Sequence, residues 1–199
     1  MFVNQKLAVL FLLSLSISGG CSTSVQQSAF PNISFAHLPP IGLNVARIEV
    51  ENRYVTPATK PHIEHKLPIS LAATASNWGR DRLRAQGKWG VVRVIIRRAS
   101  FVEVPLKRSP GLKGVFTRDQ SQRYDAVIDI LIELRDVSGK VRVTAESVAS
   151  RSRSVSEEIS LTETEKIWFQ MIEELMFDLN NSLVRQINRH MREWLKTQF

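Results

Sequence analysis

"SQRYDAVIDILIELRDVSGKVRVTAESVAS", residues 121–150, is the stretch that decides the fold of this chain. Over residues 121–136 apolar side chains take alternate positions, which is typical of a β-strand with one buried face. That face holds Tyr124, Ala126, Ile128, Ile130, Ile132 and Leu134. Charged residues dominate the opposite face: Arg123, Asp125, Asp129, Glu133 and Arg135. Residues 136–139 form a turn that ends in glycine, and residues 140–150 return as a second strand, so the stretch predicts an antiparallel hairpin.

A long amphipathic helix is predicted for residues 160–199, where Thr162 and Glu165 have the spacing of an N-terminal capping box. Its apolar residues recur at helical spacing. They are Trp168, Met171, Ile172, Leu175, Leu179, Leu183, Ile187, Met191 and Trp194. From Thr162 to Lys196 such a helix is about 50 Å long at about 1.5 Å per residue. We therefore expect residues 187–199 to overhang the sheet, bend, or contact a partner or a membrane surface.

A second helix is predicted for residues 70–87. Ser70 is placed to cap its N-terminus, and Gly87 stands where a helix often ends on a left-handed glycine. Basic residues load its C-terminal end, where cations complement the helix dipole.

Two further strands are predicted for residues 41–55 and 89–106, and residues 56–68, with three prolines, form a long loop. The element order is then β-α-β-β-β-α. One sheet face is apolar, and the two helices have the apolar stripes to cover it, while the charged face remains in water. We predict an α+β two-layer sandwich, in which an antiparallel sheet of about four strands is covered on one face by two helices.

The N-terminus has the three parts of a secretory signal: a basic start at Lys6, an apolar run over residues 7–17, and small residues before Cys21. The apolar run is too short to span a bilayer as a helix. This stretch resembles the lipobox of bacterial lipoproteins, although Ser18 stands where that pattern usually has leucine. The alternative is a secreted protein with an incidental cysteine.

The lipobox resemblance implies cleavage after residue 20 and acylation of Cys21. The predicted division is residues 1–20 as signal peptide, 21–40 as lipidated tether and 41–199 as one α+β domain. Ser22, rather than aspartate, favours the outer membrane by resemblance to the sorting rule of enteric bacteria. Cys21 is the only cysteine, so an internal disulfide is excluded.

The chain is basic, with a formal net charge of +8. Without residues 1–20 the count is 26 basic minus 19 acidic residues, or +7. A basic exported protein can contact anionic headgroups, glycolipid phosphates or an acidic protein, and we expect no nucleic-acid partner. The alternative is a cation-rich surface that only confers solubility.

Two basic regions are candidate binding sites. Residues 78–98 hold the densest cationic cluster, from which we select Arg80, Arg84 and Lys88. The alternative is that Arg82 or Arg93 pairs with Asp129 or Glu133 across the sheet, while the helix arginines are only solvated.

The connection over residues 105–120 is the second region, because it places cations around apolar residues. That pattern suits a membrane interface or a protein groove, although a long connection can also be simply disordered. Its candidate binding residues are Arg108, Leu112, Lys113, Phe116 and Arg118.

His62, Glu64 and His65 could begin a metal site, but a zinc site needs a further ligand, and a solvated loop is the simpler interpretation. The sequence contains no Gly-x-Ser-x-Gly motif, no phosphate-binding glycine loop and no Cys–His pair. We expect no enzyme activity, no cofactor and no metal.

The stretches "RYDAVIDILIELRDVSGK" and "ETEKIWFQMIEELMFDLNNSLVRQI", together with the anchor, resemble two families of Gram-negative envelope lipoproteins. One is the lipopolysaccharide-assembly lipoprotein that plugs an outer-membrane barrel, although the Cys-Gly-Phe start of that family is missing here. The other is the auxiliary lipoprotein of ABC-type lipid transporters.

The resemblance implies a periplasm-facing, non-enzymatic accessory subunit of an envelope lipid-transport or outer-membrane assembly machine. Its protein partner would be an outer-membrane barrel or an ABC-transporter subunit, and its acyl anchor would contact membrane lipid. The alternative function is direct binding of an anionic lipid or glycolipid by the basic surface; an envelope hydrolase is a third possibility.

Overall fold

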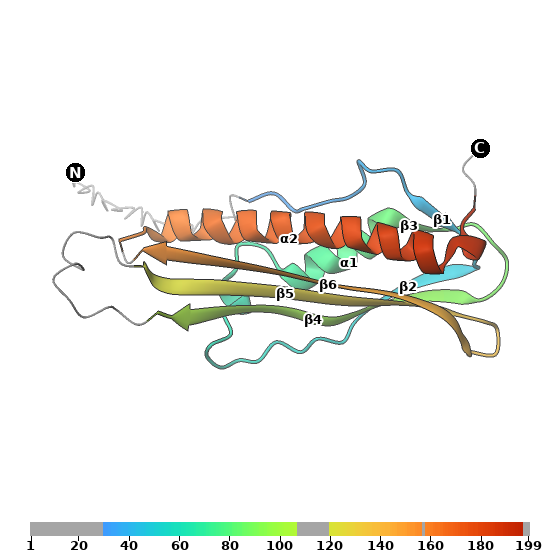
Figure 1. Cartoon of the computed structure of the whole chain (residues 1–199), viewed down its shortest axis with the longest axis horizontal. Helices are drawn as coiled ribbons and strands as arrows, with labels where there is room; N and C mark the ends of the chain where they lie inside the picture. Colours follow the sequence, from blue (N-terminus) through green and yellow to red (C-terminus); the bar gives the residue numbers. More distant parts are fainter. Residues whose placement is uncertain (1–29, 107–119, 157, 197–199) are drawn as a thin grey trace, which may run out of the picture.

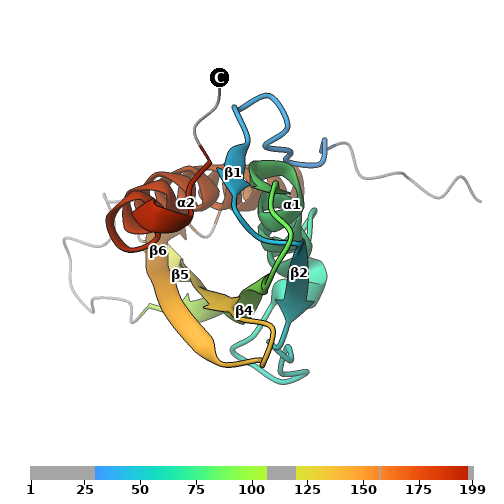
Figure 2. The same ribbon diagram turned by 90° about the vertical axis from the view of Figure 1, so that its right-hand side faces the viewer.

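The structure, a computed structural model, describes residues 30–106, 120–156 and 158–196. A four-stranded sheet with the order β2-β4-β5-β6 forms one layer, and helices α1 and α2 form the other. Figure 1 shows both helices on one face of the sheet, and Figure 2 shows the two layers end-on. The predicted α+β two-layer architecture is confirmed.

The predicted hairpin forms the centre of the sheet. Strands β4 (Val91–Pro105), β5 (Gln120–Arg135) and β6 (Val141–Ser156) are antiparallel neighbours. The six apolar residues predicted for the inner face of β5 are each at most 2% exposed. Gly139 adopts a φ of +83°, and the Asp136 carboxylate accepts backbone hydrogen bonds within the turn. Strand β6 runs six residues beyond the predicted end at residue 150.

The first predicted strand differs from the prediction in two ways. Residues 41–55 divide into β1 (Ile41–Leu43) and β2 (Arg47–Asn52), and β2 runs parallel to β4, so the sheet is mixed rather than wholly antiparallel. A parallel pair needs a long crossover connection, which the segment containing α1 (Leu71–Arg82) supplies. Strand β1 instead pairs in parallel with β3 (Leu83–Ala85), forming a separate small sheet.

Helix α1 begins as predicted, since the Ser70 hydroxyl accepts a hydrogen bond from the Ala73 amide (3.2 Å). It ends at Arg82 and not at Gly87, because the next three residues extend to form β3. The prediction of a left-handed Gly87 is wrong. Glycine is required there by close approach: a Cβ would lie 2.5 Å from the Asn44 backbone.

Helix α2 (Leu161–His190) carries the predicted apolar stripe against the sheet. Its N-cap is Ser160, whose hydroxyl and backbone form the capping box with Glu163, so the predicted Thr162–Glu165 pair is wrong by two residues. No helix in the three described ranges is long and apolar enough to cross a membrane.

Residues 192–196 fold back rather than overhanging the sheet. After a short 3-10 helix, η3 (Arg192–Trp194), the Lys196 amide donates to the carbonyl oxygen of Gly42 in β1 (2.9 Å). The Trp194 ring packs edge-on against Trp89, with 4.7 Å between the ring centroids. Residues 192–196 therefore hold the end of α2 against the small sheet.

Residues 30–40, which the sequence assigned to the tether, pack against the helices. Phe35 is buried, and its amide donates to the Asp81 carboxylate in α1 (2.8 Å). Phe30 lies against Phe169 of α2, with 5.1 Å between the ring centroids. The packed domain thus includes residues that precede the predicted boundary at residue 41; Cys21 lies outside the described residues.

A polar contact joins the two helices inside the core. Asn180 of α2 accepts hydrogen bonds from the Trp78 indole (3.0 Å) and the Arg82 guanidinium (3.1 Å). Arg82 also donates to the carbonyl oxygen of Pro39, and burial lowers the pKa of its guanidinium. This contact fixes the position of α1 relative to α2.

The apolar layer predicts a sharp difference between two substitutions in the same sheet. Ile130→Ala removes a side chain that is 0% exposed, and should lower the free energy of unfolding by about 2–5 kcal/mol. Val148→Ala shortens a side chain that is 62% exposed, and should change the free energy of unfolding by less than about 0.5 kcal/mol. Guanidinium denaturation of both variants measures this; equal effects would contradict the assigned burial.

Candidate functional site

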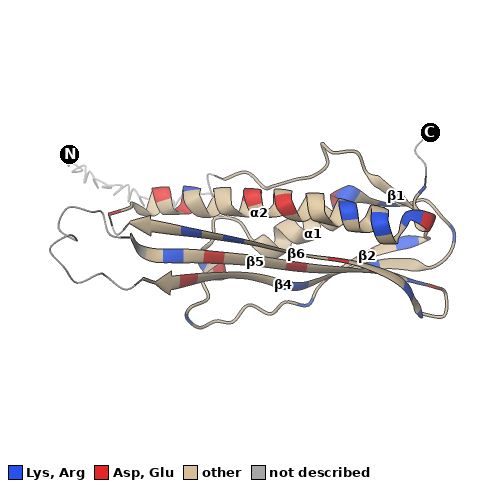
Figure 3. Cartoon of the chain, viewed as in Figure 1, with Lys and Arg blue, Asp and Glu red and all other residues tan. Residues whose placement is uncertain are grey.

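One end of the molecule is strongly cationic. Residues 80–88 and 185–196 carry eight lysines and arginines against two carboxylates, Asp81 and Glu193. Figure 3 marks basic residues in blue along the ribbon at the end where α2 finishes and β1 lies. We call the following exposed residues the cationic end: Arg80, Arg84, Lys88, Arg185, Arg189, Arg192 and Lys196.

The small sheet brings these two segments together. Arg84 in β3 stands opposite Gly42 in β1, and Gly42 accepts the backbone hydrogen bond from Lys196. The Arg84 guanidinium also donates to carbonyl oxygens of Arg80 and Leu83, which lie at the end of α1. Along α2, Arg185 and Arg189 are four residues apart and therefore lie on one helix face.

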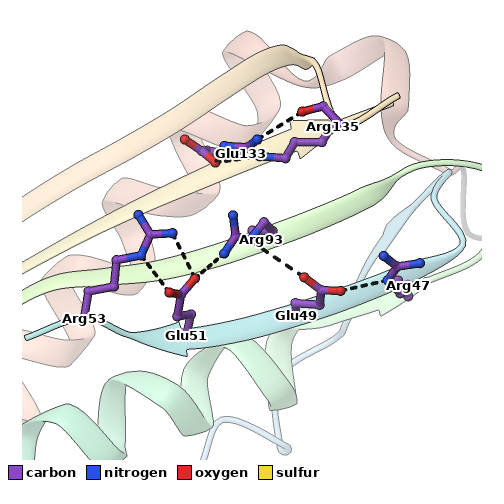
Figure 4. Close-up of polar contacts among 8 residues, drawn as sticks. Arg47, Glu49, Glu51, Arg53, Arg93, Glu133 and Arg135 are labelled. Atoms are coloured by element: carbon purple, nitrogen blue, oxygen red, sulfur yellow. Dashed lines mark hydrogen bonds and ion pairs between the residues drawn. The ribbon is translucent and has the colours of Figure 1, made fainter. Parts of the chain in front are cut away.

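The arginines on the outer face of the large sheet are arranged differently, because they are paired with carboxylates. Figure 4 shows a row that runs from Arg47 through Glu49, Arg93 and Glu51 to Arg53. Pairs continue across the other strands, joining Arg97 to Asp129 (2.7 Å), Arg123 to Asp125 (2.9 Å) and Arg135 to Glu133 (2.7 Å).

The sequence anticipated pairing across the sheet but selected the wrong residues. Arg93 pairs with Glu51 and Glu49 of β2, while Arg82 points inward to Asn180. Within the described ranges, no member of the cationic end forms an ion pair. These cations therefore leave a net positive field at one end.

Some of the other predicted site residues lie at the cationic end, and the rest lie outside the described residues. Arg80, Arg84 and Lys88 are exposed and lie at the cationic end. Cys21, Arg108, Leu112, Lys113, Phe116 and Arg118 lie outside the described residues. Arg185, Arg189 and Arg192 were not selected from the sequence; their spacing of four and then three residues on a predicted helix is the signal that could have found them.

A pocket of about 490 Å³ lies between the sheet and the start of α2, away from the cationic end. Its polar lining comes from Lys66, Glu103, Gln122, Tyr124, Ser156 and Thr164, and its apolar lining from Ile63, Pro105, Ile159, Leu161 and Trp168. Burial, and then the nearby Glu103 carboxylate, raise the pKa of Tyr124 to about 12, so its hydroxyl remains protonated at neutral pH.

The histidine-rich loop is organised around Glu64. Its Oε1 lies 2.8 Å from the Tyr54 hydroxyl, 2.9 Å from Nδ1 of His62 and 3.0 Å from the Phe101 amide, all in hydrogen-bonding geometry. These contacts attach the loop to β4, together with the hydrogen bond that the Ile63 amide donates to the Phe101 carbonyl oxygen. The described residues contain no cluster of three or more possible metal ligands, and His65 is exposed.

Comparisons with known proteins assign no family to this chain. Neither protein-family models nor curated proteins match it. A minor lipoprotein from Acinetobacter baumannii is 12% identical, with a TM-score of 0.37, covering 78% of this chain and 99% of its own. An uncharacterized lipoprotein B from Nitrosomonas europaea is 15% identical, with a TM-score of 0.37 and coverages of 74% and 83%. Rare lipoprotein B from Shewanella oneidensis is 9% identical, with a TM-score of 0.30 and coverages of 70% and 97%.

Glu64 predicts a pH dependence of stability. Burial alone would raise its pKa, but the hydrogen bonds from His62, Phe101 and Tyr54 outweigh burial and leave the pKa below 4.5. Because the folded pKa is lowered, the stabilisation is present above the unfolded pKa and is lost as pH falls through the folded value. The difference in unfolding free energy between the wild type and Glu64→Gln should therefore shrink as pH falls below about 4.5.

Urea denaturation at a series of pH values measures this difference. Glu158→Gln is a matched control for the loss of one carboxylate, because Glu158 is exposed, and it should change the unfolding free energy by less than about 0.5 kcal/mol. If the difference in unfolding free energy between the wild type and Glu64→Gln stays constant or grows in acid, the lowered pKa of Glu64 is contradicted.

Proposed function

We propose that this chain is a lipid-anchored, periplasm-facing lipoprotein of a bacterial envelope that docks on a protein partner through its cationic end. Its role is that of a non-enzymatic accessory subunit in a lipid-transport or outer-membrane assembly machine. One observation carries the docking proposal: the arginine row on the sheet is neutralised by neighbouring carboxylates, whereas the cations at one end form no ion pair with any residue that the structure describes. An unneutralised cationic surface favours association with an acidic protein surface.

The anchor follows from the N-terminal sequence. Cys21 stands directly after a run of small residues and precedes Phe30 by nine residues, which span at most about 31 Å. Phe30 rests against Phe169 in the first third of α2. The short connection therefore holds the domain close to the membrane, and Ser22 favours the outer membrane.

Direct binding of an anionic lipid or glycolipid is the second candidate function. The same cations support it, because guanidinium groups form paired hydrogen bonds with phosphate and carboxylate oxygens. The two candidates differ in what covers the cationic end: an acidic protein or a phosphate-bearing membrane.

Anchoring predicts the behaviour of a single substitution. Cys21→Ser removes the thiol that carries the lipid, so the exported chain should move from the membrane fraction to the soluble periplasmic fraction. Thr23→Ser, two residues away, should leave the protein in the membrane fraction. Cell fractionation followed by mass spectrometry of the N-terminal peptide measures both; an unacylated Cys21 in a membrane-bound wild type would contradict the anchor.

Docking predicts a charge-dependent contact at Asn188, which is exposed between Arg185 and Arg189. A photoreactive residue at this position in living cells should crosslink to one envelope protein. Reversing Arg185, Arg189 and Arg192 to glutamate should reduce that adduct by about tenfold or more. Reversing Arg153 and Lys166, which are exposed elsewhere, should leave it unchanged. Adducts with lipid alone would favour the second candidate, and an adduct insensitive to charge reversal would overturn docking through these cations.

A further inference from the structure

The pocket beside the start of α2 follows from the unequal lengths of the two layers. Strands β4 and β5 continue to Pro105 and Gln120, but α1 begins at Leu71 and covers the middle of the sheet. In Figure 1, α2 extends to the end of β4 that its arrowhead marks, whereas α1 lies nearer the middle of the sheet. Among the residues that the structure describes, the space between the layers is therefore open at this end, and buried side chains line the pocket there.

The inner wall offers a hydrogen-bond donor that the protein itself does not satisfy. Trp168 is 4% exposed, and its indole Nε1 forms no hydrogen bond of standard geometry with a described residue, although the Tyr124 hydroxyl lies near enough for Trp168 to lower the pKa of Tyr124 slightly. The ring is fixed edge-on against Tyr124, with 5.3 Å between the ring centroids, and it also contacts Phe101. Leaving a buried N–H without an acceptor is costly, so this donor favours a ligand that brings an acceptor oxygen.

The remaining lining selects an uncharged, amphipathic ligand. The charges of Lys66 and Glu103 balance, and the Tyr124 hydroxyl lies 2.9 Å from Oε1 of Gln122. At the start of α2 the lining is apolar, with Ile159 half-buried and Leu161 71% exposed. A polar inner wall beside an apolar rim matches a molecule with a carbonyl group and a hydrocarbon tail.

The position of the pocket agrees with such a ligand, given the anchor of the proposed function. Trp168 adjoins Phe169, which holds Phe30 at the start of the described chain. Cys21 lies at most about 31 Å from that contact. The pocket is consequently on the part of the domain that the anchor keeps closest to the membrane.

We propose that this pocket binds a single acyl chain through its ester or amide carbonyl, which accepts a hydrogen bond from Trp168 Nε1. A volume of about 490 Å³ falls within the usual range for sites that hold one small ligand. This inference rests on the proposed function only for the supply of lipid. The pocket and the cationic end are separate surfaces, so each can fail without the other.

Fluorescence quenching tests the site directly. The full chain with Cys21→Ser, purified without detergent, is titrated with 1-(2-bromostearoyl)glycerol below its aggregation concentration. Bromine quenches tryptophan only at close contact, and the bromine on the carbon beside the carbonyl lies next to an indole that donates to that carbonyl. The expected result is saturable quenching that disappears in Trp168→Phe. Trp194→Phe is the matched control and should retain the quenching, since Trp194 packs against Trp89 at the cationic end. No saturable quenching, or quenching that persists in Trp168→Phe, would overturn the proposal.

Calorimetric titration with 1-stearoylglycerol then tests the hydrogen bond itself. Trp168→Phe keeps an aromatic ring but removes the donor, and should weaken binding about three- to tenfold. Leu161→Ser, at an exposed position, should also weaken binding without unfolding the domain. Glu173→Gln, exposed further along α2, should leave affinity unchanged. Equal affinity in Trp168→Phe and Glu173→Gln would contradict the assigned donor.

The lipidated wild type distinguishes two sources of the acyl chain. If the chain attached to Cys21 fills the pocket, the lipidated protein should bind added 1-stearoylglycerol more weakly than Cys21→Ser does. If the pocket serves membrane lipid, the two forms should bind it equally. Both results support an acyl site, whereas failure to bind in both forms would overturn it and leave docking through the cationic end unaffected.

Discussion

The inner face of β5 is the constraint on which the rest of the structure depends. Six alternate residues of this strand are apolar and almost fully buried, so a layer of comparable length must cover them. A 16-residue strand extends about 54 Å at 3.4 Å per residue, and the 30-residue α2 extends about 45 Å. The length of α2 therefore approaches that of the strand, and its unbroken apolar stripe supplies most of the cover that this face needs.

The same constraint determines what the two ends can do. At one end β4 and β5 extend beyond α1, and a pocket forms between the layers, in which a buried indole N–H has no hydrogen-bond partner among the described residues. At the other end, residues 192–196 fold back onto β1 and fix the last turn of α2 beside β3. That arrangement collects cations from two distant segments on one surface, while ion pairs neutralise the outer face between the ends. The charge contrast is the basis for assigning docking to the cationic end.

The elements predicted well from the sequence are those whose pattern is local. Alternation in β5 and helical spacing in α2 each reveal a buried face without knowledge of the partner layer. The parallel direction of β2 was missed, because strand direction depends on the crossover and not on the alternation within residues 47–52. Ser160 and Thr162 have equivalent capping spacing to a glutamate three residues later, so the sequence alone does not separate them.

The candidate site was harder to predict from the sequence, for a similar reason. Arg80, Arg84 and Lys88 were identified from local charge density, and their binding role stays a prediction. Their neighbours in α2 are about a hundred residues away, and only the fold brings them together. The pocket depends on the relative lengths of strands and helices, which no short motif encodes.

Hydrogen–deuterium exchange in native membrane vesicles tests the central claim, that the cationic end is the covered surface, most directly. Backbone amides in residues 86–90 and 188–196 are compared between the vesicle-bound protein and purified Cys21→Ser. The account predicts slower exchange in these two segments on the vesicles than in the purified protein, and a return to the exchange rates of the purified protein after a wash at high salt. Unchanged exchange at the cationic end, with protection confined to other surfaces, would contradict it.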